Sequence, residues 1–241
     1  MYATVAILVG ILFSTCVYGQ ASESDSLFVQ SARNRAISLY EQTLKQQAHV
    51  YEGDQYVGHD PRIKIHPFYR TDSLQNGTVL FNGVQYRDVN MQYDIVWDQL
   101  IIQPLGGGYR LRLRPDKIAA FSLGAHQFAR IVGDSVAGVR TGFYELIYNG
   151  RVKALARRAK TVQEDISGGV YKADYLPKDR FLIVKDGAFY EVKSKRSVLN
   201  VFPDQAKELR KYLRQNKLKF NEEVREQTIA KLTQRYDELT H

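Results

Sequence analysis

The dipeptide Asn82-Gly83 is the feature of this sequence that most constrains its fold. It lies between two apolar-rich runs, and a two-residue type I′ turn requires a positive φ at both positions, which Asn and Gly adopt readily. The spacing predicts a hairpin in which Phe81 lies opposite Val84. Asp98-Gln99 then leads into the apolar run 100–102, so we expect three consecutive antiparallel strands over residues 77–102.

Beyond the first turn, apolar residues occupy every second position and polar residues fill most of the gaps. This is the period of a strand that has one buried face and one solvated face. We therefore expect one set of side chains in the core and the other in water. The core set is Val89, Met91, Tyr93, Ile95 and Trp97, and the solvated set is Asn90, Gln92 and Asp94.

The same turn chemistry predicts two more hairpins. Asn149-Gly150 would place Tyr148 opposite Arg151, and Asp186-Gly187 marks the tip of the other hairpin. The predicted hairpins span residues 142–158 and 181–193, two short strands flank Gly124, and the polar segment 163–175 is predicted as a loop.

Helical periodicity is confined to the two ends of the chain. Apolar residues at spacings of three and four predict an amphipathic helix over about 27–45 that packs against the sheet. Asp204 and Asn221 open two further helical patterns, which predict a C-terminal helical hairpin over 204–241. The expected fold class is α+β, with an antiparallel, hairpin-rich sheet that is either open or curled into an open barrel. Residues 48–69 are expected to form loops and one edge strand.

The N-terminal segment has the pattern of a secretory signal peptide. Residues 5–18 are almost all apolar or small, a stretch shorter than the ~20 residues of a membrane span, and polar residues follow. Val17 and Gly19 fit the −3 and −1 positions of a cut before Gln20, with a retained anchor as the alternative. Cys16 lacks the flanking residues of a lipobox and is interpreted as an ordinary apolar-segment residue. The domains predicted are 1–19 (signal), 20–203 (mainly β) and 204–241 (helical).

Charge and cysteine content indicate the compartment and the kind of partner. The 241 residues carry a formal net charge of +8 and contain one cysteine. The predicted cleavage removes this cysteine and leaves the side-chain charge unchanged. An exported chain without disulfides fits a bacterial envelope, in the periplasm or at the periphery of the outer membrane, and we expect no transmembrane span in the mature chain. A basic protein there is attracted to an acidic envelope protein, anionic lipid or lipopolysaccharide, whereas nucleic acid is not an expected partner.

Basic side chains supply the candidate binding residues. The run 109–114 alternates apolar and Arg residues, so a strand would bury Tyr109, Leu111 and Leu113 and expose the arginines. If neighbouring strands carried both basic groups, the result would be a cationic patch. The alternative is that these charges only keep the outer face of the sheet soluble. The candidate basic face comprises Arg110, Arg112, Arg114, Arg151, Lys153, Arg157 and Arg158.

Motifs for catalysis are weak. The run 133–138 is similar to the nucleophile elbow of serine hydrolases around Ser135, with His126 or His59 as a partner, but the second Gly is displaced and no helical pattern follows. A plain turn is the preferred interpretation. His59 and His66 share a loop with Asp60 and are interpreted as polar turn residues rather than metal ligands. We therefore assign no catalytic residue, no metal and no cofactor.

Paired carboxylates were the remaining catalytic pattern. Asp94 and Asp98 are four residues apart on a predicted strand, which places them on one face, as glycoside hydrolysis would need. Asp98 falls at the turn, however, and Asp94 belongs to the predicted solvated set. A solvated face is the preferred interpretation.

An ordered series of short motifs resembles an uncharacterised family of exported, signal-bearing envelope proteins from Bacteroidota. The resemblance implies a periplasmic or outer-membrane-associated location and supplies no activity, cofactor or catalytic residue. It covers most of the mature chain and rests on the Gly19-Gln20 junction and the runs HPFY (66–69), GTVLFNGVQYRDV (77–89), QYD (92–94) and FYEVKSK (189–195).

The leading hypothesis from the sequence is a non-catalytic, exported binding or assembly module that contacts a protein or an anionic envelope component through its sheet. The first alternative is a hydrolase that acts on envelope polymers, which requires a cleft with converging titratable groups. The second is a lipid-carrying half-barrel, which requires a large apolar pocket.

The signal prediction is tested by the mass of the exported protein. Expression in a bacterium with an outer membrane should yield an envelope product that begins at Gln20. Intact-mass analysis checks this, and a product that retains residues 1–19 would support the retained anchor. Replacing Gly19 by Trp should block cleavage, because the −1 position accepts small side chains.

Overall fold

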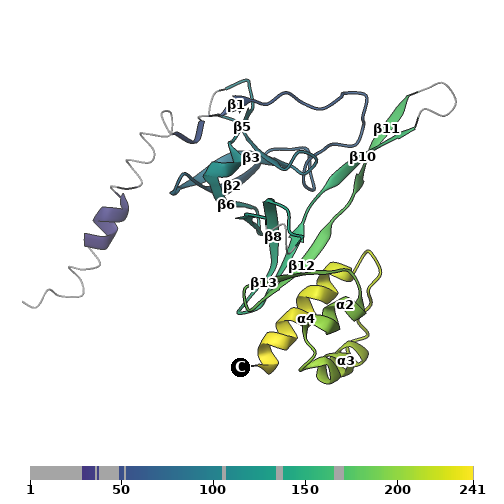
Figure 1. Cartoon of the computed structure of the whole chain (residues 1–241). Coiled ribbons are helices and arrows are strands. Elements are labelled where there is room, and N and C mark those ends of the chain that lie inside the picture. The colour runs from purple at the N-terminus through teal and green to yellow at the C-terminus, as the bar shows by residue number, and fades with distance from the viewer. Residues whose placement is uncertain are drawn as a thin grey trace, which may run out of the picture. The chain divides into compact units, whose positions relative to one another are not determined.

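The computed structural model describes residues 29–35, 37, 49–51, 53–104, 107–133, 138–165 and 171–240 (Figure 1). The chain forms two compact units, Met1–Ala48 and His49–His241. In the first unit, residues 29–35 and 37 are helical and their side chains are exposed. The predicted packing of this helix against the sheet stays a prediction. The predicted signal segment 1–19 and the run 134–137, which contains Ser135, lie outside the described residues.

An antiparallel sheet of eleven strands dominates the described part of the second unit. Its strand order is β1-β5-β4-β3-β2-β6-β7-β8-β9-β12-β13, and no pairing joins the two edge strands among the described residues, so the sheet is open. The α+β class is confirmed. The strands are β1 (Asp54–Gln55), β2 (Gln75–Phe81), β3 (Val84–Asp94), β4 (Gln99–Ile102), β5 (Leu111–Arg112), β6 (Ile118–Leu123), β7 (His126–Ile131), β8 (Gly142–Asn149), β9 (Lys153–Arg157), β12 (Arg180–Lys185) and β13 (Ala188–Val192).

The central hairpin forms as the turn chemistry predicts. Asn82 and Gly83 have φ values of 52° and 80°, and Phe81 pairs with Val84 across the turn. The predicted core set is buried as far as Ile95, with Met91 fully buried. Trp97 departs from the alternation, because it lies in the 95–98 turn rather than in a strand, and it is 46% exposed.

The predicted solvated face of β3 is wrong at its C-terminal end, where Gln92 and Asp94 are buried. Side chains from the segment before β2 contact this face, since the Tyr56 hydroxyl and His59 Nε2 lie 3.0 and 2.6 Å from the Asp94 carboxylate. Phe68 forms a β-bridge with Asp94, and the amide of Tyr69 donates to the carbonyl of Tyr93 at 2.8 Å. The side-chain amide of Gln92 donates to a backbone carbonyl of the same segment. The second half of β3 is therefore buried on both faces.

The second predicted hairpin forms with a different register. Asn149 pairs with Lys153 and Tyr148 with Ala154, so the connection has three residues and the predicted pair Tyr148 and Arg151 is wrong. A carboxylate on helix α4 (Arg225–Leu239) explains the change. Asp237 accepts hydrogen bonds from the Tyr148 hydroxyl at 2.9 Å and from the Arg151 amide at 3.1 Å. By contrast, the turn at Asp186-Gly187 has two residues, as predicted.

The predicted loop over 163–175 is wrong. Residues Lys160–Asp165 (β10) and Lys172–Pro177 (β11) form a separate antiparallel hairpin with six register pairs. This hairpin, which we call the arm, extends away from the main sheet (Figure 1). Most of its side chains are exposed, so it lacks the buried apolar face that sequence periodicity detects.

Three helices cover one face of the strands β8, β9, β12 and β13 (Figure 1). They are α2 (Lys195–Val201), α3 (Ala206–Gln215) and α4 (Arg225–Leu239). The last two were predicted, whereas α2 was not, although Ser194 gives it a capping box. None of the described helices has the length and apolar character needed to span a membrane. The sheet side of this core is Val152, Ala154, Ala156, Phe181, Ile183 and Val192, and the helix side is Val198, Leu199, Val201, Phe202, Leu209, Leu213, Ile229, Leu232 and Tyr236.

Gly77 on β2 offers a test of the central pairing. An added methyl group at this position would lie 2.0 Å from the backbone oxygen of Ser122 on β6, so the two strands would have to separate. Gly77→Ala should lower the free energy of unfolding by about 1–3 kcal/mol in urea denaturation. Gly58→Ala is the matched control, since nothing lies within 4 Å of its added methyl group, and it should change stability by less than about 0.5 kcal/mol. Equal effects of both substitutions would contradict the packing described here.

Candidate anion-binding site

A pocket of about 270 Å³ lies at the base of the arm. Four stretches of chain meet there: the 95–98 turn, the segment before β8, the passage from β9 into β10, and the passage from β11 into β12. Of its eleven lining residues, six are cationic and one is acidic. We call it the basic pocket. Its lining comprises Arg140, Arg157, Arg158, Lys160, Lys178, Arg180, Asp98, Ile95, Val96, Ala159 and Thr161.

Backbone pairing at the base of the arm brings these cations together. The chain leaves the main sheet after Arg157 and returns at Arg180. Where the two passages meet, the amide of Lys178 donates to the carbonyl of Ala159 at 2.8 Å. The amide of Lys160 donates to the carbonyl of Ile95 at 3.2 Å, which attaches the 95–98 turn to the same point. Basic residues that are about twenty positions apart in the sequence therefore line one hollow.

Asp98 holds Arg157 against the pocket. The Asp98 carboxylate lies 3.6 Å from the Arg157 guanidinium and accepts hydrogen bonds from the Tyr93 hydroxyl at 2.6 Å and from the Phe143 amide at 3.3 Å. Burial raises the pKa of Asp98, and the Tyr93 hydrogen bond and the Arg157 charge oppose this rise. Because three donors already surround this carboxylate, its role is to orient Arg157 and not to bind a ligand.

Lys160 forms no ion pair with a carboxylate in the described part of the chain. Its ammonium donates to the carbonyl oxygens of His66 at 2.6 Å and Phe68 at 3.1 Å. A lysine ammonium has three donors, so one remains. Burial lowers the pKa of Lys160, because a cation loses solvation there.

Arg140, Lys178 and Arg180 form the exposed rim of the pocket. Within the described ranges, none of the three side chains pairs with an acidic group. A second, smaller hollow adjoins the pocket and shares Arg140, Arg157 and Arg180 with it.

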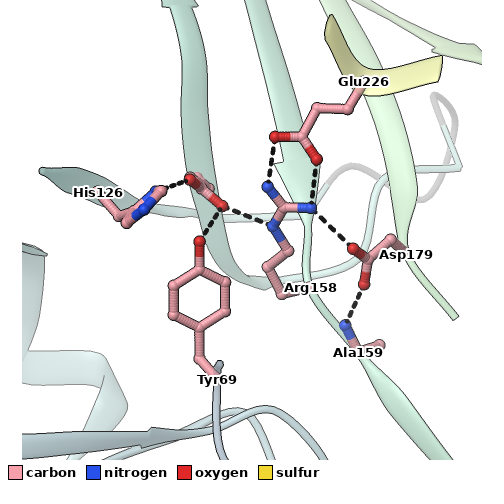
Figure 2. Close-up of polar contacts among 7 residues, drawn as sticks. Tyr69, His126, Arg158, Ala159, Asp179 and Glu226 are labelled. Atoms are coloured by element: carbon pink, nitrogen blue, oxygen red, sulfur yellow. Dashed lines mark hydrogen bonds and ion pairs between the residues drawn. The ribbon is translucent and has the colours of Figure 1, made fainter. Parts of the chain in front are cut away.

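Arg158 differs from the other cations because it is buried, with 8% of its side chain exposed. Figure 2 shows its guanidinium between Glu226 and Asp179. It donates to Glu226 at 2.7 and 2.8 Å, to Asp179 at 2.8 Å and to Glu145 at 2.5 Å. Burial disfavours the charged guanidinium, but the three carboxylates outweigh this and raise the pKa of Arg158. We call these four residues the Arg158 network.

Two further side chains complete the environment of Glu145. The Tyr69 hydroxyl donates to Glu145 at 3.0 Å, and His126 Nδ1 lies 2.5 Å from its other oxygen (Figure 2). Burial and the Glu145 charge raise the pKa of Tyr69. Glu226 is desolvated, which would raise its pKa, but its bonds to Arg158 lower the pKa overall. The network therefore joins β8, the residue after β9, the passage into β12 and helix α4, and His126 adds strand β7.

Asp94 and His59 form a separate cluster. Asp94 accepts from the amides of Val96 and Trp97 at 2.9 and 3.0 Å, and its other oxygen contacts the Tyr56 hydroxyl at 3.0 Å and His59 Nε2 at 2.6 Å. The His59 ring stacks on Trp97 with ring centroids 3.6 Å apart. Asp94 thus fixes the 95–98 turn, and each of the two predicted paired carboxylates has its own donors. No group of three or more potential metal ligands occurs in the part of the chain that the structure describes.

The structure separates the predicted basic residues. Only Arg157 and Arg158 line the pocket. The strands β5 and β9 are not neighbours in the sheet, so the two predicted groups do not form one patch across adjacent strands. Three of the other five form ion pairs with acidic residues: Arg112 with Asp54, Arg114 with Asp116, and Arg151 with Asp237. Arg151 also donates to Thr240. Arg110 lies over the Phe68 ring, and Lys153 is exposed on β9.

Sequence reasoning missed Arg140, Lys178 and Arg180 as site residues. A signal for two of them was present, since basic residues flank the polar segment 163–175 on both sides. If that segment is a hairpin, its two basic flanks lie side by side.

Comparison with models of protein families, with curated proteins and with solved structures finds no match to this chain.

The Arg158 network is tested by removing its cation. Arg158→Met leaves the buried carboxylate of Glu145 without its ion pair, so the free energy of unfolding should fall by about 3–5 kcal/mol. Arg112→Gln, which breaks the exposed pair with Asp54, should cost at most about 1 kcal/mol. Urea denaturation of both variants makes the comparison, and a loss no larger for Arg158→Met than for Arg112→Gln would contradict the structural role.

The pH dependence of stability should carry the signature of Glu226. Its pKa is lower in the folded protein than the ordinary value of 4.5, so its stabilising contribution is complete above that value and is lost as the pH falls through the folded pKa. The difference in unfolding free energy between wild type and Glu226→Gln should therefore be largest near neutral pH and shrink on acidification. A difference independent of pH would show that the ion pair is not its source.

Proposed function

We propose that this chain is a non-catalytic, exported binding module of the bacterial envelope that holds an anionic envelope component in the basic pocket. The observation that carries the proposal is the convergence of six cationic side chains on one pocket with a single acidic residue in its lining. Like charges held close together repel one another, and an anion bound between them relieves that repulsion.

The chemistry of the lining favours oxyanions. Arginine offers a planar fork of donors that matches carboxylate and phosphate oxygens, and lysine adds a compact charge. The apolar contribution to the lining is small, namely Ile95, Val96 and Ala159. A headgroup fits such a lining better than an acyl chain does, so the pocket favours the anion-binding hypothesis over the lipid-carrying one.

The proposal agrees with the sequence-based expectation of an exported, basic protein. An envelope component with phosphate or carboxylate groups would meet the exposed rim of Arg140, Lys178 and Arg180 first. It would then reach Lys160, which retains one free donor. Because the rim is exposed, attraction there is screened by salt over about 10 Å at 0.1 M ionic strength, so binding should weaken as salt is added.

Binding of inorganic phosphate by calorimetric titration tests the proposal. The pocket variant, Arg140→Gln/Lys178→Gln/Arg180→Gln, should lose about tenfold or more in affinity, because hydrogen bonds between charged groups contribute roughly 1.5–3 kcal/mol each. The control variant, Arg112→Gln/Arg114→Gln/Lys153→Gln, removes the same number of arginines and lysines outside the pocket and should bind as wild type does. Equal losses in both variants would mean that overall charge, not the pocket, governs binding.

A further inference from the structure

Strand β13 forms one end of the main sheet and pairs with β12 on one side only. The residues that flank its two-residue turn, Lys185 and Ala188, form a hydrogen-bonded pair, and such pairs alternate along an antiparallel ladder. The N–H and C=O groups of Phe189 and Glu191 therefore point away from β12. No strand in the described part of the chain pairs with them.

Nothing in the sequence of β13 blocks this edge. An edge strand with free backbone groups is a template for another extended chain unless proline, a bulge or a covering segment prevents pairing. β13 contains no proline, and its register with β12 has no bulge. The available edge ends at Lys193, whose amide donates to the Ser197 hydroxyl at 3.0 Å. Phe189 and Glu191 thus offer two donors and two acceptors to an added antiparallel strand.

The side chains of Phe189 and Glu191 lie on the face of the sheet opposite the helices, because the alternating residues of β12 and β13 pack against those helices. Phe189 is directly opposite Val184, and Glu191 is directly opposite Leu182. Phe189 and Val184 are only partly buried and pack against a small cluster that includes the buried Leu182. An apolar side chain on an added strand, beside Phe189, would extend this apolar row.

A row of basic residues crosses the sheet at the C-terminal end of β13. By the register of the two strands, Lys193 is the residue opposite Arg180, and Arg180 pairs in turn with Arg157 on β9. Two acids lie near this row: Asp98 is 3.6 Å from Arg157, and Glu191 lines a small hollow with Arg157 and Arg180. Three cations minus two acids leave one positive charge, and Lys193 has no ion pair in the described part of the chain.

From these observations we infer that β13 is the docking site for an extended, acidic segment of a partner protein, which joins the sheet as an added antiparallel strand. The partner places an acidic residue beside Lys193, a polar residue opposite Glu191 and an apolar residue opposite Phe189. Read from its N-terminus, the segment is acidic-x-polar-x-apolar.

A second copy of this chain fits the edge less well. β13 and the residue after it read apolar-x-acidic-x-basic, so a copy in which both Phe189 and Glu191 pair places no acid beside Lys193. Two chains that each carry a formal charge of +8 also repel one another. The inference goes beyond the proposed function, because no residue of β13 lines the basic pocket.

Binding of a synthetic peptide tests the inference. The heptapeptide Thr-Glu-Val-Thr-Val-Val-Thr carries the pattern from its second residue to its sixth, and fluorescence anisotropy of a labelled copy measures its affinity for the full chain. N-methylation of its fourth and sixth residues, whose N–H groups would face β13, should lower the affinity about tenfold or more, because two hydrogen bonds are lost. N-methylation of the third and fifth residues, which face away, should lower it far less; equal losses would overturn the inference.

Two substitutions of Glu191 separate the backbone from the side chain. Glu191→Pro removes an outward N–H, which an edge strand tolerates, and should lower the peptide affinity about tenfold or more. Glu191→Gln removes the same charge but keeps the N–H, so it should bind the peptide at least as tightly as wild type. Equal peptide affinity in Glu191→Pro and wild type would overturn the inference. Both variants should bind phosphate as wild type does, and failure of phosphate binding in all three proteins would overturn only the proposed function.

An exchange of charge keeps the inference testable if Glu191→Pro does not fold. Lys193→Glu should weaken binding of the peptide about two- to fivefold and strengthen binding of a peptide with Lys at its second residue by a similar factor, because opposite charges attract across paired strands. Lys211→Glu, on the exposed side of helix α3, is the matched control and should leave the ratio of the two affinities unchanged. The same ratio in Lys193→Glu as in wild type would contradict the predicted register.

Sedimentation of the wild type tests the second copy as an occupant. The inferred partner segment leaves the free chain monomeric. A dimer that dissociates in Glu191→Pro and does not bind the peptide would assign the β13 edge to a second copy and overturn the inference.

Discussion

The pairing of Arg158 with three carboxylates is the interaction on which most of the second unit depends. Moving a guanidinium out of water costs several kcal/mol unless partners replace the solvent, and here Glu145, Asp179 and Glu226 do so. These partners come from strand β8, the passage into β12 and helix α4. One side chain thereby connects strand β8, the base of the arm and helix α4.

The same interaction explains why the pocket can hold several cations at once. The carboxylates around Arg158 confine that charge to the interior, and Asp98 does the same for Arg157 at 3.6 Å. Backbone hydrogen bonds, rather than acids, then determine where Lys160 and Lys178 lie. Cationic side chains without an ion-pair partner in the described part of the chain consequently gather where the segments that line the pocket meet.

Local turn chemistry determines how much of the fold could be predicted from sequence. Asn82-Gly83 and Asp186-Gly187 behave as their φ preferences require, and the strands on either side pair directly across each turn. The hairpin at Asn149-Gly150 forms, but its predicted register was wrong, because Asp237 on α4 holds the connection, a contact that no local pattern reveals. The burial of Asp94 was missed for a similar reason, since Tyr56 and His59, which contact its carboxylate, lie 38 and 35 residues earlier in the chain.

The site was harder to predict than the fold. Arg157 and Arg158 were predicted because basic residues cluster in that part of the sequence. Their roles differ, however, and only the structure shows that Arg158 is buried among carboxylates. Lys178 and Arg180 were missed because the polar arm has no apolar stripe to mark it as a hairpin. Arg112 shows the opposite error: it was predicted as a binding residue, but it forms an ion pair with Asp54, which lies in a strand 58 residues earlier in the chain.

The contact between Asp237 and the β8–β9 connection also has a consequence for the order of events during synthesis. The residue that sets this register lies 86 positions after the amide it holds, so the hairpin emerges from the ribosome long before its partner does. Early pairing can follow the two-residue preference of Asn149-Gly150 until α4 arrives. The hydrogen bond that holds this connection therefore forms only after α4 has been synthesised.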